Sequence, residues 1–178
     1  YLSRWAGGQF EREINWQIVD GATDPEQWHD APVLLISGAT APKLGAAELG
    51  KLRRYVQEGG RLMTVTECLG RAFDAAWRGG GPVKGFYEQL FPDYELKRLP
   101  HDHPIYNIHY KIRRAVPLYG LSNGVRLLAL HTTEDLILPW QVNRSSTAVD
   151  RFQLAANIAL YFNDLSPGRA RGASTWPE

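Results

Sequence analysis

The sequence predicts an α/β fold with a mainly parallel sheet, and three neighbouring features predict it. Residues 33–36 are consecutive apolar residues bounded by proline and glycine, which is typical of a strand buried on both faces. Residues 45–58 carry leucine and valine at three- and four-residue steps, which predicts an amphipathic helix that Gly59-Gly60 ends. Residues 61–66 predict the next strand. A strand, a helix and a strand of these lengths make a right-handed βαβ unit with parallel strands.

Before this unit, the chain is expected to be irregular apart from two short elements. Residues 1–13 are polar and contain Trp5-Ala6-Gly7-Gly8, which predicts a loop. Apolar residues alternate over 15–19, which predicts a short strand, and Asp24-Pro25 marks a turn. Residues 26–30 are expected to make one helical turn.

After the unit, helices and strands are expected to alternate. Residues 71–77 predict a helix, 78–82 a glycine-rich loop and 83–90 a second short helix. Residues 94–99 are expected to form a strand, and 101–110 a loop rich in histidine.

The last part of the chain predicts a hairpin, a helix and a tail. Two strand-like runs, 118–121 and 125–130, flank Asn123-Gly124, and this dipeptide is the strongest short signal for a β-hairpin. Residues 150–162 place their apolar side chains on one side of a helix. Residues 165–178 contain Pro, Gly, Ser and Arg without periodicity and are expected to be a flexible tail or linker.

Composition indicates one globular domain, expected over residues 1–164, and bears on its partners. The chain has 178 residues, enough for a full core. Its net charge is +1, so it lacks the basic excess expected of a protein that binds nucleic acid or an anionic membrane. No apolar run is long enough to span a bilayer. The partner is therefore expected to be a small molecule or a protein, with no nucleic acid and no direct membrane insertion.

The chain opens on Tyr1 without an initiator methionine, so we expect it to be a piece of a longer protein. Its single cysteine, Cys68, excludes an intramolecular disulfide and any zinc site built from several thiolates. One thiol is compatible with the cytoplasm and with the bacterial periplasm or envelope, so the compartment stays open.

Cys68 lies between the strand over 61–66 and the helix expected over 71–77. The carboxyl end of a parallel strand is where ligands collect, and amides at a helix start can activate a thiol and hold an oxyanion. This position favours a nucleophile. The alternative is a small buried apolar side chain, which is what a lone cysteine usually is.

Two stretches resemble class I glutamine amidotransferases, namely Leu35-Ile36-Ser37-Gly38 and Thr66-Glu67-Cys68-Leu69-Gly70. In those enzymes a Ser-Gly-Gly loop supplies an oxyanion amide, and a Gly-x-Cys-x-Gly elbow carries the nucleophile. The resemblance implies Cys68 as nucleophile, His131 as base and Glu134 as the residue that orients the base. The chain departs from the family by having Thr66 in place of the first elbow glycine. It also has one residue more between His131 and Glu134 than the family's His-Pro-Glu.

A closer resemblance covers residues 5–164, to a bacterial family defined only as a domain of unknown function within the glutamine amidotransferase-like superfamily. The shared elements are Trp5-Ala6-Gly7-Gly8, the run from Leu52 to Val65, and the loop Pro100-His101-Asp102-His103-Pro104-Ile105. Related trehalose-utilisation-type domains have a similar His-Pro-Ile loop without the catalytic triad. The resemblance implies a three-layer α/β sandwich, flavodoxin-like or glutamine amidotransferase-like. A Greek-key or hairpin addition is expected late in the chain, where the Asn123-Gly124 signal lies.

The loop with His101, Asp102 and His103 is a candidate metal site, to which His109 and Glu67 could contribute further ligands. Imidazoles and carboxylates suit Zn, Ni, Fe or Mn, so the cofactor would be a divalent metal. The alternative is a turn, in which Asp102 bonds backbone amides and the following proline fixes φ.

The sequence therefore favours a non-catalytic ligand-binding or interaction module of a larger protein. Its ligand site is expected at the carboxyl ends of the strands, with Gly38, Glu67 and Trp140 as binding residues. Two enzymatic alternatives stay open. One is a Cys-dependent hydrolase or amidotransferase that uses Cys68 and His131, and the other is a metal-dependent enzyme that uses the histidine-rich loop.

Overall fold

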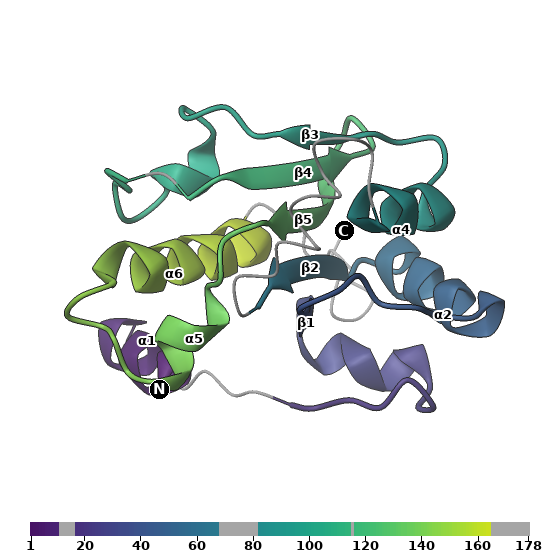
Figure 1. Cartoon of the computed structure of the whole chain (residues 1–178), viewed down its shortest axis with the longest axis horizontal. Helices are drawn as coiled ribbons and strands as arrows, with labels where there is room; N and C mark the ends of the chain where they lie inside the picture. The colour runs from purple at the N-terminus through teal and green to yellow at the C-terminus, as the bar shows by residue number, and fades with distance from the viewer. Residues whose placement is uncertain (11–16, 68–81, 115, 165–178) are drawn as a thin grey trace, which may run out of the picture.

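The computed structural model describes residues 1–10, 17–67, 82–114 and 116–164. Within these residues, five strands form one sheet in the spatial order β1-β2-β5-β4-β3 (Figure 1). Their bounds are β1 Val33–Gly38, β2 Arg61–Thr66, β3 Leu96–Arg98, β4 Leu118–Ser122 and β5 Leu127–Thr132. β2 pairs in parallel with β1 and β5, whereas β4 is antiparallel to both of its neighbours. Four of these strands therefore run in one direction, and the expected α/β fold with a mostly parallel sheet is confirmed.

Helices cover both faces of this sheet. In chain order they are α1 Leu2–Phe10, η1 Pro25–Asp30, α2 Ala46–Gln57, α4 Pro82–Leu90, η2 Pro104–Tyr106, α5 Ile137–Gln141 and α6 Val149–Asp164. α1, α5 and α6 lie on one side, and η1, α2 and α4 lie on the other (Figure 1). No helix in the described part of the chain is long and apolar enough to cross a membrane.

The β1–α2–β2 unit forms where the sequence predicts it. The apolar face of α2 is buried through Leu49, Leu52 and Val56. Gly59 has φ +116°, a left-handed conformation that glycine adopts without strain, and it ends the helix two residues before β2 begins. The local pattern and the backbone geometry therefore agree in this part of the chain.

The central strands separate two apolar cores. In β2, Met63 and Val65 belong to the core that α6 closes, whereas Leu62 belongs to the core that α2 closes. All residues of β2 and β5 are buried, as expected for strands covered by helices on both faces. Residues 33–36 of β1 are only half-buried. The expectation of a strand buried on both faces is wrong there, because β1 lies at the edge of the sheet.

The loop expected at the amino terminus is also wrong, because residues 2–10 form α1. Leu2 and Ala6 are buried. Trp5 packs edge-on against Phe152 of α6, with 5.4 Å between the ring centroids. These contacts outweigh the low helix propensity of glycine, which costs about 1 kcal/mol per residue.

Some expected elements lie outside the described residues. These are the helix over 71–77, nearly all of the loop over 78–82 and the tail over 165–178. The strand expected over 15–19 is described only from Gln17 onward, and residues 17–19 carry no strand.

The hairpin at Asn123-Gly124 is confirmed and joins β4 to β5. The Asn123 side-chain oxygen accepts hydrogen bonds from the N–H groups of Val125 at 3.0 Å and Arg126 at 2.9 Å. β5 pairs with β2 as well as with β4. The hairpin therefore supplies a central strand of the sheet, and the expectation of a late addition to the sheet is wrong for β5.

Candidate functional site

The carboxyl ends of β1, β2 and β5 meet at one edge of the sheet, because these three strands are parallel. The Gly38 carbonyl accepts a hydrogen bond from the Glu67 N–H at 2.9 Å. The Thr66 hydroxyl donates to the Thr132 carbonyl at 3.3 Å. Gly38 and Glu67, two of the three predicted ligand-binding residues, are thus neighbours at the edge where parallel α/β sheets bind their ligands.

A cleft of about 530 Å³ lies beside this edge, between the β1–α2 connection and α4. Leu44, Leu49 and Phe86 contribute apolar surface, and among the described residues that line the cleft only Lys43 is charged. Its volume is within the range of small-molecule sites, roughly 300–1,000 Å³. Sequence reasoning missed the cleft because its walls come from segments that are far apart in the chain.

Glu134 and Trp140 are both held by Arg151 near the start of α6. A carboxylate oxygen of Glu134 lies 2.9 Å from the Arg151 guanidinium. The Trp140 indole N–H donates to the Arg151 carbonyl at 3.2 Å, and its ring is only 6% exposed. Glu134 is therefore positioned by an arginine, and Trp140 packs in the apolar core.

His131 is fully buried and belongs to a chain of hydrogen bonds under α4. Its Nδ1 lies 2.8 Å from the Thr64 hydroxyl, which in turn lies 2.9 Å from the Tyr87 hydroxyl. Burial lowers the pKa of His131 to about 4 and raises the pKa of Tyr87. The imidazole is therefore neutral at pH 7.

Two members of the predicted catalytic triad are described, and they have different partners. His131 bonds Thr64 inside the core, whereas Glu134 pairs with Arg151 at the half-exposed start of α6. Cys68 lies outside the described residues. The catalytic role of these three residues stays a prediction.

The histidine-rich loop forms turns that its own side chains support. His103 Nδ1 accepts a hydrogen bond from the Ile105 N–H at 3.3 Å, and the imidazole lies 5.3 Å from the Tyr161 ring. Burial lowers the pKa of His103. His101 and Asp102 are exposed. Within the described ranges, no three His, Cys, Asp or Glu side chains gather as a metal would require.

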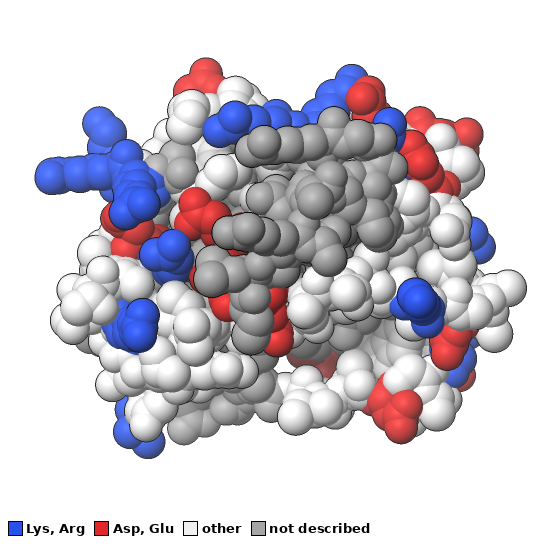
Figure 2. Space-filling view, in the orientation of Figure 1, with Lys and Arg blue, Asp and Glu red and all other residues white. Residues whose placement is uncertain are grey.

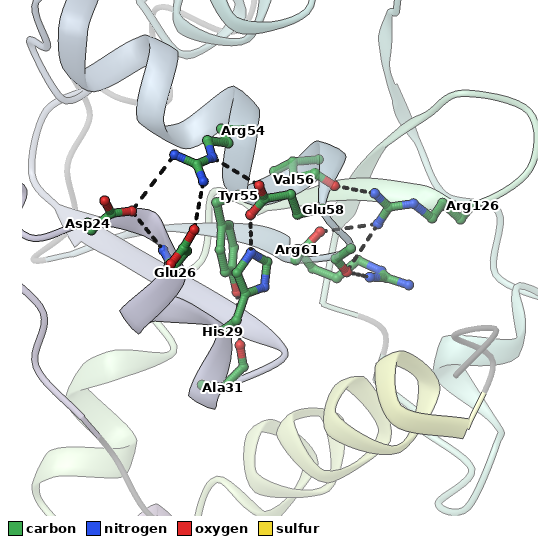
Figure 3. A network of polar contacts seen from close by, with 12 residues as sticks. Asp24, Glu26, His29, Ala31, Arg54, Tyr55, Val56, Glu58, Arg61 and Arg126 are labelled. Carbon is green, nitrogen blue, oxygen red and sulfur yellow. Dashed lines mark hydrogen bonds and ion pairs between the residues drawn. The ribbon is translucent and has the colours of Figure 1, made fainter. Parts of the chain in front are cut away.

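A polar network at the opposite end of the sheet was not anticipated from the sequence (Figure 3). Glu58 accepts a hydrogen bond from Arg54 at 2.9 Å and lies 3.0 Å from His29 Nε2. Arg54 also reaches Glu26 at 2.9 Å. The hydrogen bonds from Arg54 and then from His29 lower the pKa of Glu58. These contacts tie η1 to the end of α2.

Two arginines complete the end of α2 beside this network (Figure 3). Arg126 donates to the carbonyls of Val56 and Gly60, and Arg61 donates to the Gly59 carbonyl. Helix ends leave carbonyls without an intrahelical partner, and these guanidinium groups supply the donors. The sequence indicated where α2 ends, through Gly59-Gly60, but it did not indicate which side chains would donate to the carbonyls at that end.

Charged side chains of both signs surround the face shown in Figure 2. Lys84 pairs with Glu88 at 3.5 Å, and Lys97 pairs with Glu95 at 3.2 Å. Exposed pairs of this kind contribute about 0–1 kcal/mol each, so they do not by themselves mark a functional site.

Comparison with protein-family models matches residues 2–162 to a family described as a domain of unknown function, DUF4159. The match extends from α1 through almost all of α6. The chain belongs to the DUF4159 family. The matched residues contain the five described strands, the two apolar cores and the carboxyl-edge cleft of this chain. No curated protein matches the chain. The family description carries no activity, so any function must be argued from the geometry.

Proposed function

We propose that this DUF4159 domain is a non-catalytic binding module, whose ligand occupies the cleft at the carboxyl edge of the sheet. The observation that carries the proposal is the burial of His131. Its imidazole has no exposed surface and is bonded to Thr64, and burial holds its pKa at about 4. A general base works best with a pKa near the operating pH and within reach of a reacting atom. His131 fits a structural role better than that of a base.

The cleft supports a small ligand with an apolar body and one acidic group. Leu44 and Phe86 offer apolar contact, and Lys43 offers a cation at the rim. Thr40 and Gln89 can add hydrogen bonds. A site with mostly apolar walls and few polar groups is the usual composition of a small-molecule pocket.

We also propose that the family belongs to the glutamine amidotransferase-like superfamily, with a flavodoxin-like arrangement of layers. The support is the parallel β1–α2–β2 unit and the helices on both faces of the sheet. Fold alone assigns no reaction, so this kinship leaves the binding proposal unchanged.

Alkylation of Cys68 separates the binding module from the Cys-dependent enzyme. The rate of reaction with iodoacetamide is measured from pH 5 to pH 9 in the native chain and in His131→Gln. The proposal expects the rate to rise with an apparent pKa of about 8.5, as for an ordinary thiol, and to be the same in both proteins. A rise below pH 7 that disappears in His131→Gln would instead support a thiol–imidazole pair.

Two matched glycine substitutions test the cleft itself. Gly85 of α4 lines the cleft, and Gly50 of α2 does not. Both are helical, and neither has an atom within 4 Å of an added Cβ. We expect a library of small apolar carboxylic acids to raise the melting temperature of the native chain and of Gly50→Leu, but not of Gly85→Leu. Equal shifts in all three proteins would place the acids elsewhere.

A further inference from the structure

The outer edge of β1 presents backbone groups that the rest of the sheet does not use. The Pro32 carbonyl accepts from the Arg61 N–H at 3.1 Å, and the Gly38 carbonyl accepts from Glu67. The backbone N–H and C=O groups of successive residues point to opposite edges of a strand, so those of the even-numbered residues of β1 point toward β2. The N–H and C=O groups of Val33, Leu35 and Ser37 therefore face outward. Within the described ranges, no backbone hydrogen bond reaches these three residues.

A groove of about 740 Å³ runs along the same edge. Leu2 of α1, Trp140 of α5 and Ala159 of α6 line it on one side of the sheet, and Trp28 of η1 and Leu52 of α2 line it on the other. Residues 33–36 form its floor and are half-buried. Ile18 also lines the groove and is fully exposed, so a bound segment would cover it.

The groove carries almost no charge. Among the described residues that line it, Glu48 is the one ionised side chain, and its carboxylate already accepts the Gly45 N–H. An anionic occupant would lose its hydration without gaining a cation, and a cationic occupant would find only the Glu48 carboxylate. The charge of the groove therefore matches an uncharged, apolar occupant.

We propose that an extended, uncharged and apolar segment of another polypeptide binds in this groove as a sixth strand beside β1. An extended backbone supplies donors and acceptors at the spacing of the outward groups of Val33, Leu35 and Ser37. Within the described residues, β1 itself contains no charged residue, no proline and no bulge, which are common protections of a sheet edge. The walls on both sides admit a single segment more readily than the edge of a second folded copy, whose own helices would meet them.

This inference goes beyond the proposed function, because the strand groove and the carboxyl-edge cleft take different partners. If the acidic ligands do not bind to the cleft, the proposal of a strand in the groove still stands. If no peptide binds in the groove, the proposal of a ligand in the cleft still stands. The two proposals are therefore tested separately.

Ser37 offers a matched pair of variants. Its side chain is exposed and its N–H faces outward, so Ser37→Pro removes one edge donor without removing a bond to β2. Ser37→Ala keeps the N–H and is the control. The probe is an array of capped, fluorescein-labelled decapeptides composed of Val, Ile, Leu, Ser and Thr, titrated with the full chain by fluorescence anisotropy.

We expect a subset of these peptides to bind the native chain and Ser37→Ala equally, and to bind a folded Ser37→Pro about tenfold more weakly. The same peptides are also made with N-methyl groups on alternate residues, in two versions. The version whose methylated N–H groups would face β1 should not bind, whereas the other version should bind. In hydrogen-exchange NMR, the Leu35 and Ser37 amides should exchange fast in the free chain and slowly in the complex.

Three results would overturn the proposal. One is that no peptide of the array shows binding below about 1 mM that Ser37→Pro weakens. Another is slow exchange of the Leu35 amide in the free monomer, which would mean that the chain itself already covers this edge. The third is a concentration-dependent dimer that Ser37→Pro abolishes, which would assign the edge to a second copy.

Discussion

His131 and Thr64 are register partners across the β2–β5 pair, and the imidazole Nδ1 lies 2.8 Å from the threonine hydroxyl. The same hydroxyl lies 2.9 Å from that of Tyr87, which belongs to α4. One threonine therefore links the two central strands to the helix above them. A buried polar group without a partner is costly, so each member of this chain depends on the others.

The first prediction concerns pH. His131 has a pKa of about 4 in the folded protein, against about 6.5 in an unfolded chain. Between these values the unfolded state binds more protons, so the free energy of unfolding falls as pH falls from 6.5 to 4, by up to about 3 kcal/mol. Urea unfolding at intervals from pH 7 to pH 4 measures this slope. His131→Gln should show a shallower slope, and an equal slope would assign the effect to other groups.

The second prediction tests the shared hydroxyl. Thr64→Val keeps the side-chain shape but leaves His131 and Tyr87 without their common partner. We expect a loss of about 1–3 kcal/mol in the free energy of unfolding. Thr64→Ser keeps the hydroxyl and should cost less. If valine were no worse than serine in the same denaturant titration, the hydrogen-bond chain would not contribute to stability.

The third prediction tests whether residues 2–10 are helical. Gly8 lies in α1 with no atom within 4 Å of an added Cβ. Gly8→Ala should therefore raise the free energy of unfolding by about 0.5–1 kcal/mol. A thermal melt with Arg4→Ala as an exposed control in the same helix measures the gain. A loop at this position, as the sequence suggests, would give no gain.

The fourth prediction concerns the close approach of Gly60 to Tyr55. A Cβ at Gly60 would overlap the Tyr55 ring, which is fully buried and whose hydroxyl donates to the Ala31 carbonyl at 3.0 Å. The ring cannot move without losing that bond, so Gly60→Ala should destabilise the fold by about 1–3 kcal/mol. Gly50→Ala, in open space on α2, should stabilise it in the same chemical denaturation experiment. Similar effects at both glycines would contradict the packing.

The fifth prediction separates Glu58 from His131 by pH window. Arg54 and His29 lower the pKa of Glu58 below its ordinary value of 4.5, so its contribution to stability is present above that pH and is lost as pH falls through the lowered pKa. Glu58→Gln should be less stable than the native chain at pH 7, and the difference should shrink well below pH 4.5. A constant difference at all pH values, measured by urea midpoints, would mean that the charge of Glu58 is not involved.

The sequence by itself determined those helices and turns that depend only on residues close together in the chain. The apolar steps of α2, its Gly-Gly end and the Asn123-Gly124 turn each depend on residues close together in the chain. The family resemblance likewise followed from short motifs and is confirmed as a domain of unknown function. The position of Gly38 and Glu67 at the same edge of the sheet also followed from the sequence, because parallel strands end at the same edge.

Only the tertiary structure decided what each element packs against. Trp5 is helical because Phe152, far along the chain, covers it, and a local reading of two glycines gives a loop. Residues 33–36 look like a central strand, yet they lie at the sheet edge, because strand order is fixed by pairing and not by composition. Its residue type made His131 a candidate catalytic base in the sequence. Its burial beside Thr64, which only the structure shows, favours a structural role. Sequence periodicity gives the faces of helices and strands, but burial, and with it pKa and accessibility, depends on which faces meet.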